Sequence, residues 1–383
     1  MKRLPESSTE LAAAAPGGVS LNVLPPATLV TPDRLQADYR APAWLRNRHL
    51  QTIWPVMVGA GPRMQYRRER WATPDGDFVD LDWAVPPQVD AVGSARTSSA
   101  RTSSAAIASA ATATAATGPL VALFHGLEGS SASHYARSLM ASALAAGWRG
   151  VVINWRGCSG EPNLLARAYH AGDSAEVDWI LRRLRPDFVA GVSLGANALF
   201  KWLGEQGSQA GFIRAAAGVS APQDLQAGAL ALSSNFNRLY CMAFMSSLKR
   251  KSLLKLDRFP GLYDRRRVAA ARDFHDFDEL VTAPLHGFES ARDYWVRSSS
   301  KQYLGAIEVP TLVLNARNDP FLPEQALARR PEVSRHVVLD YPAHGGHVGF
   351  THGGLQLRSN AGRTPVAGGW LAQRLMSFFR QFA

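Results

Sequence analysis

One short stretch constrains this chain more than any other. A strand-like apolar run, Phe188–Val192, passes through Gly-x-Ser-x-Gly directly into helical spacing from Leu194. A turn this sharp at Ser193 crowds the positions two residues before and after it, and glycine at Gly191 and Gly195 removes the clash. The hydroxyl is then held above the edge of a sheet, at a helix N-terminus that favours negative charge. The pattern predicts a serine nucleophile.

Strands and helices alternate on both sides of this turn. The expected strands are 120–124, 150–154, 188–192, 215–219, 311–315 and 336–341, and the expected helices are 133–146, 174–184, 194–206 and 370–382. Such alternation predicts an α/β fold, with a mainly parallel sheet covered by helices on both faces. Two further strands, 64–71 and 78–85, flank a turn at 73–77 and predict a hairpin before this core.

Changes in composition mark three segments outside the alternating core. Residues 1–42 are rich in Ala and Pro and predict a flexible segment before a single domain at 43–383. Residues 86–118 hold almost only Ala, Ser, Thr and Gly, with little to bury, and predict a disordered insertion. Residues 222–306 have a helical composition rich in Phe and Met. They are either ordinary packed helices or a cap that lines an acyl pocket, and they show no obvious pair of charges to bind a charged acyl tail.

The net charge of +11 raises the question of an anionic partner. Basic clusters lie at 67–70, 249–251 and 265–267, but no nucleic-acid-binding motif accompanies them, so we expect no nucleic-acid partner. We interpret most of this charge as solvated surface. Weak peripheral contact with a membrane, with 249–251 at the rim of the pocket, is a hypothesis that the charge permits.

Cysteine content and hydropathy bear on the compartment. Two cysteines in 383 residues argue against a disulfide scaffold. No apolar run approaches the roughly 18 residues that would span a bilayer, and no secretion signal opens the chain. We therefore expect a cytoplasmic protein. Cys158 follows a strand, but no histidine is placed to activate it, so we interpret it as structural.

A serine nucleophile needs a base, and the base needs an orienting carboxylate. Asp319 lies just after the strand 311–315, where α/β sheets place their sites. Asp340 is the alternative, but it lies before the last strand has ended. Among the histidines after that strand, His347 has glycines on both sides of its loop, and we assign it as the base. His344 and His352 are interpreted as loop residues with hydrogen-bonding roles.

The developing oxyanion needs two backbone N–H groups. One is expected from Leu194, directly after the nucleophile, and the other from Leu127, in the loop that follows the strand 120–124. Gly126 permits the close approach of that loop. His125 is interpreted as a structural brace and not as a second base.

Several motifs together resemble those of the YheT-type family of α/β-hydrolases. They cover the chain from about residue 42 to its end and comprise Arg46–Thr52, His125–Ser130, Asn154–Asn163, Tyr169–Gly172, Gly191–Asn197 and His347–Phe350. The resemblance implies an α/β-hydrolase fold with a cap. It also implies a carboxylesterase or acylglycerol lipase-like activity on fatty-acyl esters, without a cofactor. Carried over by position, the triad is Ser193, Asp319 and His347.

Two other classes of function compete with a serine hydrolase of small acyl esters. A non-catalytic protein that docks to membranes or proteins on the same fold would not need Ser193, Asp319 and His347 in this order. A metal enzyme is poorly supported, because neither His-Glu-x-x-His nor Cys-x-x-Cys spacing occurs, and we expect no metal. The sequence does not indicate the oligomeric state.

Overall fold

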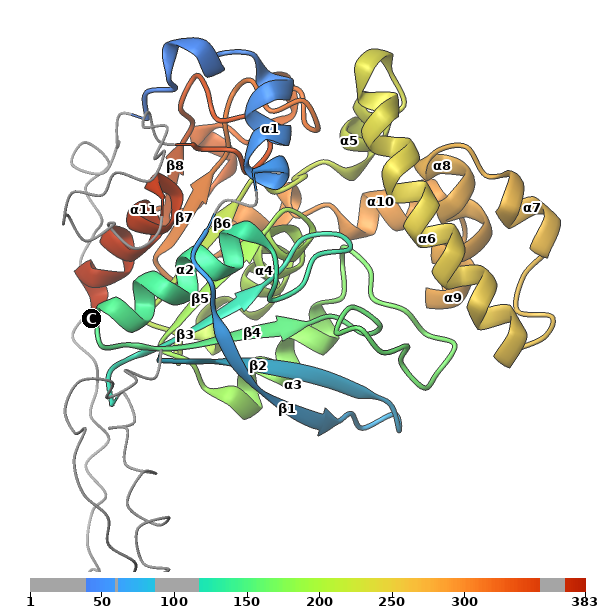
Figure 1. Ribbon diagram of the computed structural model, residues 1–383, viewed down its shortest axis with the longest axis horizontal. Coiled ribbons are helices and arrows are strands. Elements are labelled where there is room, and N and C mark those ends of the chain that lie inside the picture. The colour runs from blue at the N-terminus through green and yellow to red at the C-terminus, as the bar shows by residue number, and fades with distance from the viewer. Residues whose placement is uncertain (1–38, 59–60, 87–116, 352–368) are drawn as a thin grey trace, which may run out of the picture.

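A single sheet organises the described part of the chain. The computed structural model describes residues 39–58, 61–86, 117–351 and 369–383. The strands are β1 Gln65–Ala72, β2 Phe78–Val85, β3 Leu120–Phe124, β4 Arg149–Asn154, β5 Phe188–Val192, β6 Ala215–Val219, β7 Thr311–Leu314 and β8 Val337–Asp340. They are ordered β1-β2-β4-β3-β5-β6-β7-β8 (Figure 1). β2 pairs antiparallel with β1 and β4, and all the other pairs are parallel. The predicted mainly parallel sheet with its hairpin is confirmed.

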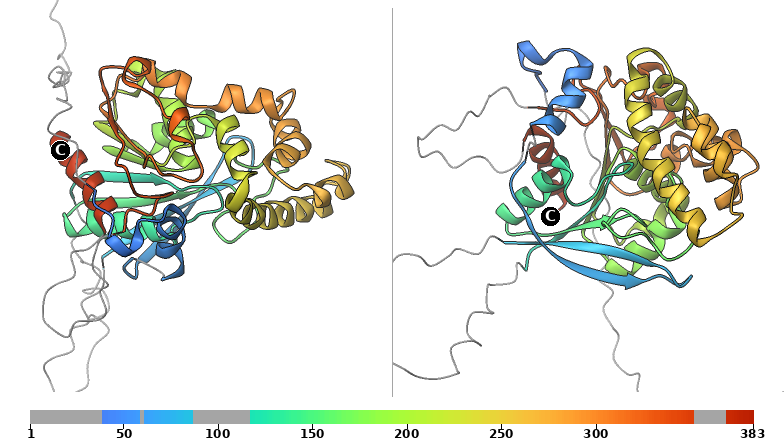
Figure 2. Two further views of the ribbon diagram at one scale, coloured as in Figure 1. Left: turned by 90° about the horizontal axis from the view of Figure 1, so that it is seen from above. Right: turned by 45° about the vertical axis from the view of Figure 1, so that its right-hand side comes forward.

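The helices divide into those that cover the sheet and those inserted between two of its strands. Their bounds are α1 Arg48–Met57, α2 His134–Ala145, α3 Ser174–Leu184, α4 Leu194–Gln206, α5 Leu225–Leu232, α6 Arg238–Arg258, α7 Arg265–Ala270, α8 Phe274–Phe277, α9 Ala283–His286, α10 Ala291–Ser298 and α11 Trp370–Phe379. Helices α5 to α10 follow β6 and precede β7, and we call them the helical insertion. Figures 1 and 2 show them gathered on one side of the sheet.

Alternate residues of the buried strands feed two apolar layers. In β3, Leu120, Ala122 and Phe124 pack in the layer that holds α3 and α4. The intervening Val121 and Leu123 pack with α2 and α11 on the opposite face. This alternation follows from the pleat of a strand and explains why every residue of β3 is apolar.

Small residues in β6 let α4 lie close behind the sheet. The strand reads Ala-Ala-Ala-Gly-Val and is buried throughout. A Cβ atom on Gly218 would lie 2.1 Å from the ring of Phe200, a residue of α4. Close packing of α4 matters because this helix begins directly after Ser193.

The helical insertion has an apolar cluster of its own. Cys241 and Met245 of α6 pack against Val268, Phe277 and Val281. These helices can therefore hold their mutual arrangement while they lie over the site, as helices that share a packed interior do. Among the described residues, no helix is both long and apolar enough to cross a membrane.

The two segments predicted to be flexible lie mostly outside the described residues. That is true of 1–38 within the predicted segment 1–42, and of 87–116 within the predicted insertion 86–118. Tyr39 lies inside the fold: its ring packs edge-on against Phe350 and Trp370. Its hydroxyl donates to the carbonyl of Thr351 at 2.9 Å.

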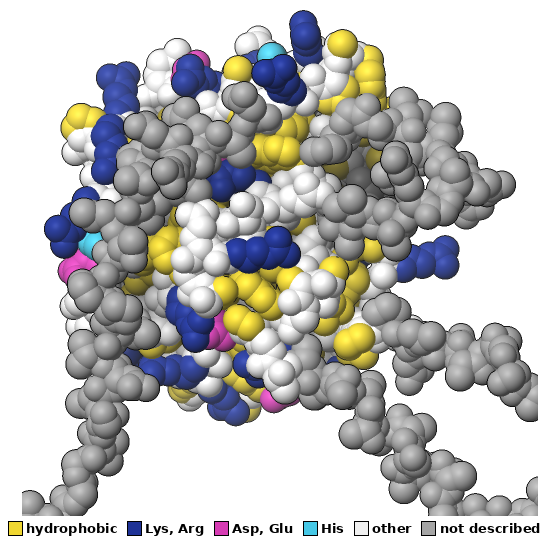
Figure 3. Space-filling model, turned by 90° about the vertical axis from the view of Figure 1, so that its left-hand side faces the viewer, with side chains coloured by type: hydrophobic (Ala, Val, Ile, Leu, Met, Phe, Trp, Pro, Cys, Tyr) yellow, Lys and Arg dark blue, Asp and Glu magenta, His cyan; other side chains and the backbone are white. Residues whose placement is uncertain are grey.

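Part of the basic charge is paired and is not a solvated face. In β1, Arg68 and Arg70 each form two hydrogen bonds with a buried aspartate of β2, Asp82 and Asp80 respectively. Figure 3 shows Lys and Arg side chains spread in separate groups over one face of the molecule. The interpretation of these clusters as solvated surface is therefore wrong for the hairpin.

Candidate active site

Ser193 sits at the sharp turn between β5 and α4. The strand ends at Val192 and the helix begins at Leu194, as the sequence predicts, and Ser193 has φ 53° and ψ −119°. That left-handed backbone is costly for a residue other than glycine and is typical of functional sites. A Cβ atom on Gly191 would lie 2.6 Å from the Cα of Ala196, and one on Gly195 would lie 2.4 Å from the carbonyl oxygen of Phe124. Glycine is therefore required on both sides of the serine.

The structure brings Ser193, His347 and Asp319 together from three different loops. His347 Nε2 lies 3.0 Å from Ser193 Oγ, and His347 Nδ1 lies 2.9 Å from Asp319 Oδ2. Because a carboxylate only accepts hydrogen bonds, Nδ1 carries the proton and Nε2 is free to accept one from the serine. The arrangement can therefore take a proton from Ser193 and stabilise the imidazolium that results.

Asp319 and the imidazole are held by Phe321. The backbone N–H of Phe321 donates to Asp319 Oδ1 at 2.8 Å. Its ring stacks on the ring of His347, with centroids 4.1 Å apart and planes 29° apart. Asp319 is 3% exposed. No sequence pattern indicated this role of Phe321.

The alternative acid and the other histidines lie elsewhere. Asp340 forms a buried ion pair with Arg374 of α11, at 2.8 Å. His344 Nδ1 accepts a hydrogen bond from the side-chain amide of Asn318 at 3.3 Å. His352 lies outside the described residues.

Residues of α1 hold the loop that carries His347. Gln51 Oε1 accepts the backbone N–H of Gly345 at 2.9 Å and a side-chain N–H of Asn318 at 3.0 Å. Thr52 Oγ accepts the backbone N–H of His347 at 2.9 Å. The sequence contained a signal for these residues, since they belong to the segment Arg46–Thr52, but nothing in it indicated which loop they would contact.

The loop after β3 reaches Ser193 where the second oxyanion donor is expected. A Cβ atom on Gly126 would lie 3.0 Å from the Cβ of Ser193. Leu127 and Leu194 both line the cavity that contains Ser193 and His347. Leu194 is the first residue of α4, and the first N–H groups of a helix have no partner within it. The geometry is compatible with an oxyanion site formed by these two N–H groups.

His125 is buried and bonded on both ring nitrogens. Nδ1 donates to the carbonyl of Gly126 at 2.8 Å, and Nε2 accepts the N–H of Trp155 at 3.2 Å. Burial lowers the pKa of His125 to about 4, so the ring is neutral. These contacts fit a brace between β3 and β4.

A cavity of about 780 Å³ opens from Ser193 between the sheet edge and the helical insertion. The apolar side chains that line it come mainly from the insertion: Leu225, Leu232, Phe244, Leu248, Phe274, Phe277, Val281, Leu285 and Trp295. Such a lining binds an apolar group by the area it removes from water. The cavity is thus placed to hold an acyl chain next to the serine.

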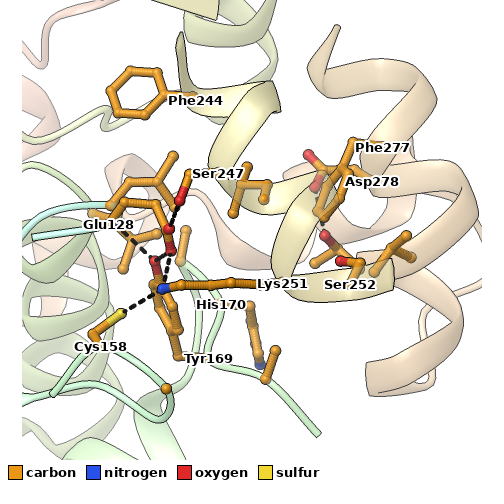
Figure 4. A pocket seen from close by; sticks show the side chains of 18 of the residues that line it. Glu128, Cys158, Tyr169, His170, Phe244, Ser247, Lys251, Ser252, Phe277 and Asp278 are labelled. Carbon is orange, nitrogen blue, oxygen red and sulfur yellow. Dashed lines mark hydrogen bonds and ion pairs between the residues drawn. The ribbon is translucent and has the colours of Figure 1, made fainter. Parts of the chain in front are cut away.

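The same cavity contains a pair of charges that the sequence analysis did not identify. Lys251 of α6 lies 2.8 Å from the carboxylate of Glu128, which follows the expected oxyanion donor (Figure 4). The expectation of no convergent charge pair at the pocket is therefore wrong. It failed because one partner lies outside the insertion, 123 positions away.

Cys158 lines the cavity without being activated. Burial is the main effect on its thiol and raises the pKa to about 11. Arg156, in the same segment, forms buried ion pairs with Asp77 and Glu176. This segment is therefore more than a tight loop, because it carries a buried charge cluster. Among the described residues, no group of three or more His, Cys, Asp or Glu side chains is arranged to hold a metal ion.

Known proteins share this fold and much of this sequence. A family model described as "alpha/beta hydrolase fold" matches residues 119–351. "Putative esterase YheT" from Escherichia coli is 35% identical over 317 residues, 81% of this chain and 86% of that protein. "Phospholipase ABHD3" from Mus musculus is 28% identical over 82% of this chain and 74% of its own. "Monoacylglycerol lipase" from Saccharomyces cerevisiae is 27% identical over 69% of this chain and 59% of its own.

Proposed function

Because this chain belongs to the α/β-hydrolase family, we propose that it is a serine hydrolase that cleaves carboxylic, fatty-acyl esters. The observation that carries the proposal is the pair of hydrogen bonds through His347. One joins Nε2 to Ser193 Oγ at 3.0 Å, and the other joins Nδ1 to Asp319 at 2.9 Å. This is the order in which a nucleophile, a general base and an orienting carboxylate act.

The reaction proceeds in two acyl transfers. Ser193 Oγ attacks the ester carbonyl while His347 Nε2 takes its proton, and Asp319 stabilises the imidazolium. His347 then returns the proton to the leaving alcohol as the tetrahedral intermediate collapses to an acyl-enzyme. Water attacks that ester with His347 again as base, which releases the acid and restores Ser193.

The negative oxygen of each intermediate needs donors fixed in advance. The backbone N–H groups of Leu127 and Leu194 are proposed to supply them, since both residues line the cavity beside Ser193. Fixed donors of this kind contribute roughly 10²- to 10³-fold each to the rate. Gly126 allows the loop of Leu127 to approach this closely.

The helical insertion is proposed to act as the cap of the site, and its cavity suggests the substrate class. A mostly apolar space of about 780 Å³ beside the serine suits an acyl chain of short to medium length. The relatives named as an esterase, a phospholipase and a monoacylglycerol lipase are consistent with acyl esters as substrates. We therefore propose simple carboxylic esters or monoacylglycerols, with amides cleaved more slowly because amines are poorer leaving groups.

A panel of p-nitrophenyl and glycerol esters of graded chain length tests this function. The wild-type protein should hydrolyse them, with kcat/KM rising with chain length until the cavity is full, and Ser193→Ala should abolish the activity. Hydrolysis that persists undiminished in Ser193→Ala, or faster cleavage of peptide amides than of esters, would contradict the proposal.

A further inference from the structure

The residues on either side of Leu127 have their backbone N–H groups held by tyrosine hydroxyls. The N–H of Gly126 donates to Tyr135 at 3.0 Å, and the N–H of Glu128 donates to Tyr169 at 2.9 Å. The N–H between them is the proposed oxyanion donor. Its direction therefore depends on how firmly both neighbours are held.

Glu128 has a backbone that does not hold itself. Its φ is 56°, in the left-handed region that L residues other than Gly, Asn and Asp seldom adopt. Such a conformation costs on the order of 1–3 kcal/mol and persists only where surrounding contacts enforce it. The contacts of Glu128 must therefore supply that constraint.

The carboxylate of Glu128 is bound by three side chains. Oε1 accepts hydrogen bonds from Tyr169 Oη at 2.9 Å and from Lys251 Nζ at 2.8 Å, and Oε2 accepts one from the hydroxyl of Ser247. Figure 4 shows these groups converging in the cavity. The side chain of Glu128 is 11% exposed, and charge-assisted bonds at this burial are stronger than neutral ones.

Two of the three partners come from the helical insertion. Ser247 and Lys251 are one turn apart on α6, so they present their polar groups on the same side of that helix. The loop that they hold packs tightly against the nucleophile, because a Cβ atom on Gly126 would lie 3.0 Å from Ser193 Cβ. A displacement of α6 would be transmitted through Glu128 to the loop beside Ser193.

We propose that Glu128 is a positioning residue that couples the placement of α6 to the direction of the Leu127 N–H. With α6 in place, Ser247 and Lys251 hold the carboxylate and the left-handed backbone, and the N–H is aimed at the oxyanion. When α6 moves away, the backbone of Glu128 relaxes and the donor is withdrawn. This inference rests on the proposed function, since it concerns the transition state of that reaction.

The test uses the full chain and removes the contact from each side. Glu128→Ala should lower kcat by about 10²-fold, the loss expected for one oxyanion donor, and Lys251→Met by roughly tenfold, with KM within about twofold of wild type. Glu128→Gln, which keeps part of the hydrogen bonding, should fall between wild type and Glu128→Ala. Arg265→Met is the matched control, because it removes a cation of the insertion that pairs with Asp257 at the surface, and it should leave kcat unchanged.

A second readout separates positioning from loss of structure. Rates are expressed per active site, counted by fluorophosphonate labelling, so unfolded protein does not contribute. The inhibition constant of a trifluoromethyl ketone, whose serine adduct carries the oxyanion, should rise by the same factor as kcat falls. The double variant Glu128→Ala with Lys251→Met should be no slower than Glu128→Ala alone, because both changes break one interaction.

The outcomes decide between this inference and the proposed function. If the wild-type protein hydrolyses esters but these variants keep kcat per labelled site, or raise KM alone, the coupling is wrong and the hydrolase stands. If the wild-type protein neither labels nor hydrolyses esters, the proposed function is wrong and the coupling falls with it. Should Glu128→Ala fail to fold, Lys251→Met and Ser247→Ala still decide, since both lie on α6 and leave the loop sequence intact.

Discussion

Thr52 holds the backbone of His347 although the two residues are 295 positions apart. The N–H of His347 donates to the hydroxyl oxygen of Thr52 at 2.9 Å, and that hydroxyl donates in turn to the carbonyl of Arg48 at 2.8 Å. The second bond fixes the hydroxyl proton on the helix side and leaves a lone pair for the loop. The start of the domain thus positions a residue near its end.

Replacing Thr52 tests whether this bond matters for the base. Thr52→Val keeps the shape but leaves the His347 N–H without its acceptor, which costs about 1–3 kcal/mol when the group is buried. We expect kcat for a p-nitrophenyl ester to fall roughly tenfold and the melting temperature to drop by a few degrees. Thr52→Ser keeps the hydroxyl and should retain most of the activity. Equal kcat in Thr52→Val and wild type would show that the loop holds itself.

Two buried aspartates at the end of the sheet should separate into one that serves the reaction and one that serves stability. Asp319→Asn leaves a neutral partner for His347 and should lower kcat by about 10⁴-fold, with little change in melting temperature. Asp340→Asn strands Arg374 without its buried carboxylate and should cost about 3–5 kcal/mol of unfolding free energy. Its kcat per folded molecule should stay near wild type. If Asp340→Asn were the variant that lost kcat, the acid would be misassigned.

Asp278 in the cavity wall gives a stability change with a defined sign in pH. Burial is the main effect on this carboxyl and raises its pKa from 3.8 to about 6, although Thr282 and Trp295 donate to it. Between these values the folded state holds a proton that the unfolded state has lost, so this group destabilises the fold as pH rises toward 6. The roughly two-unit shift corresponds to about 3 kcal/mol.

Asp278→Asn removes this effect while keeping the size of the side chain. Relative to wild type, the variant should gain about 3 kcal/mol of unfolding free energy between pH 4 and pH 7, measured by urea unfolding. A difference between the two proteins that is flat across this range would mean that Asp278 ionises as freely in the fold as in the unfolded chain.

Filling the cavity should change the preferred acyl chain. Each buried methylene contributes about 0.8 kcal/mol, so two more methylenes should raise kcat/KM roughly tenfold until the space is full. Leu285 lines this cavity, and Leu285→Trp should shift the optimum to shorter chains. Leu253→Trp is the control, because Leu253 lines a separate surface pocket. A chain-length optimum that shifts in both variants, or in neither, would argue against this cavity as the acyl site.

The sequence predicted the core elements because their limits are marked locally. The bounds of α3, β5, α4 and β6 coincide with those predicted, and Gly207 ends α4 where the helical pattern stops. The order Ser193, Asp319, His347 was predictable for the same reason, since each follows a recognisable strand. Parallel strands bring such positions to one edge of the sheet.

Contacts between distant segments could not be predicted in this way. Nothing in the pattern of α1 indicates that Gln51 and Thr52 will face the His347 loop. The expectation for the pocket failed likewise, because Lys251 looked like surface charge and its partner Glu128 comes from another segment. Such pairings are fixed by how the insertion settles on the sheet, and a hydrophobic period of one segment does not encode them.

The account's central claim is that His347 and Asp319 activate Ser193, and covalent labelling tests it most directly. A fluorophosphonate should modify one residue of the wild-type protein, and peptide mapping by mass spectrometry should place the adduct on Ser193. Ser193→Ala should take up none, and His347→Ala should label at a rate lower by several orders of magnitude, since the hydroxyl then has no base. An adduct on any other residue, or labelling of His347→Ala at the wild-type rate, would contradict the claim.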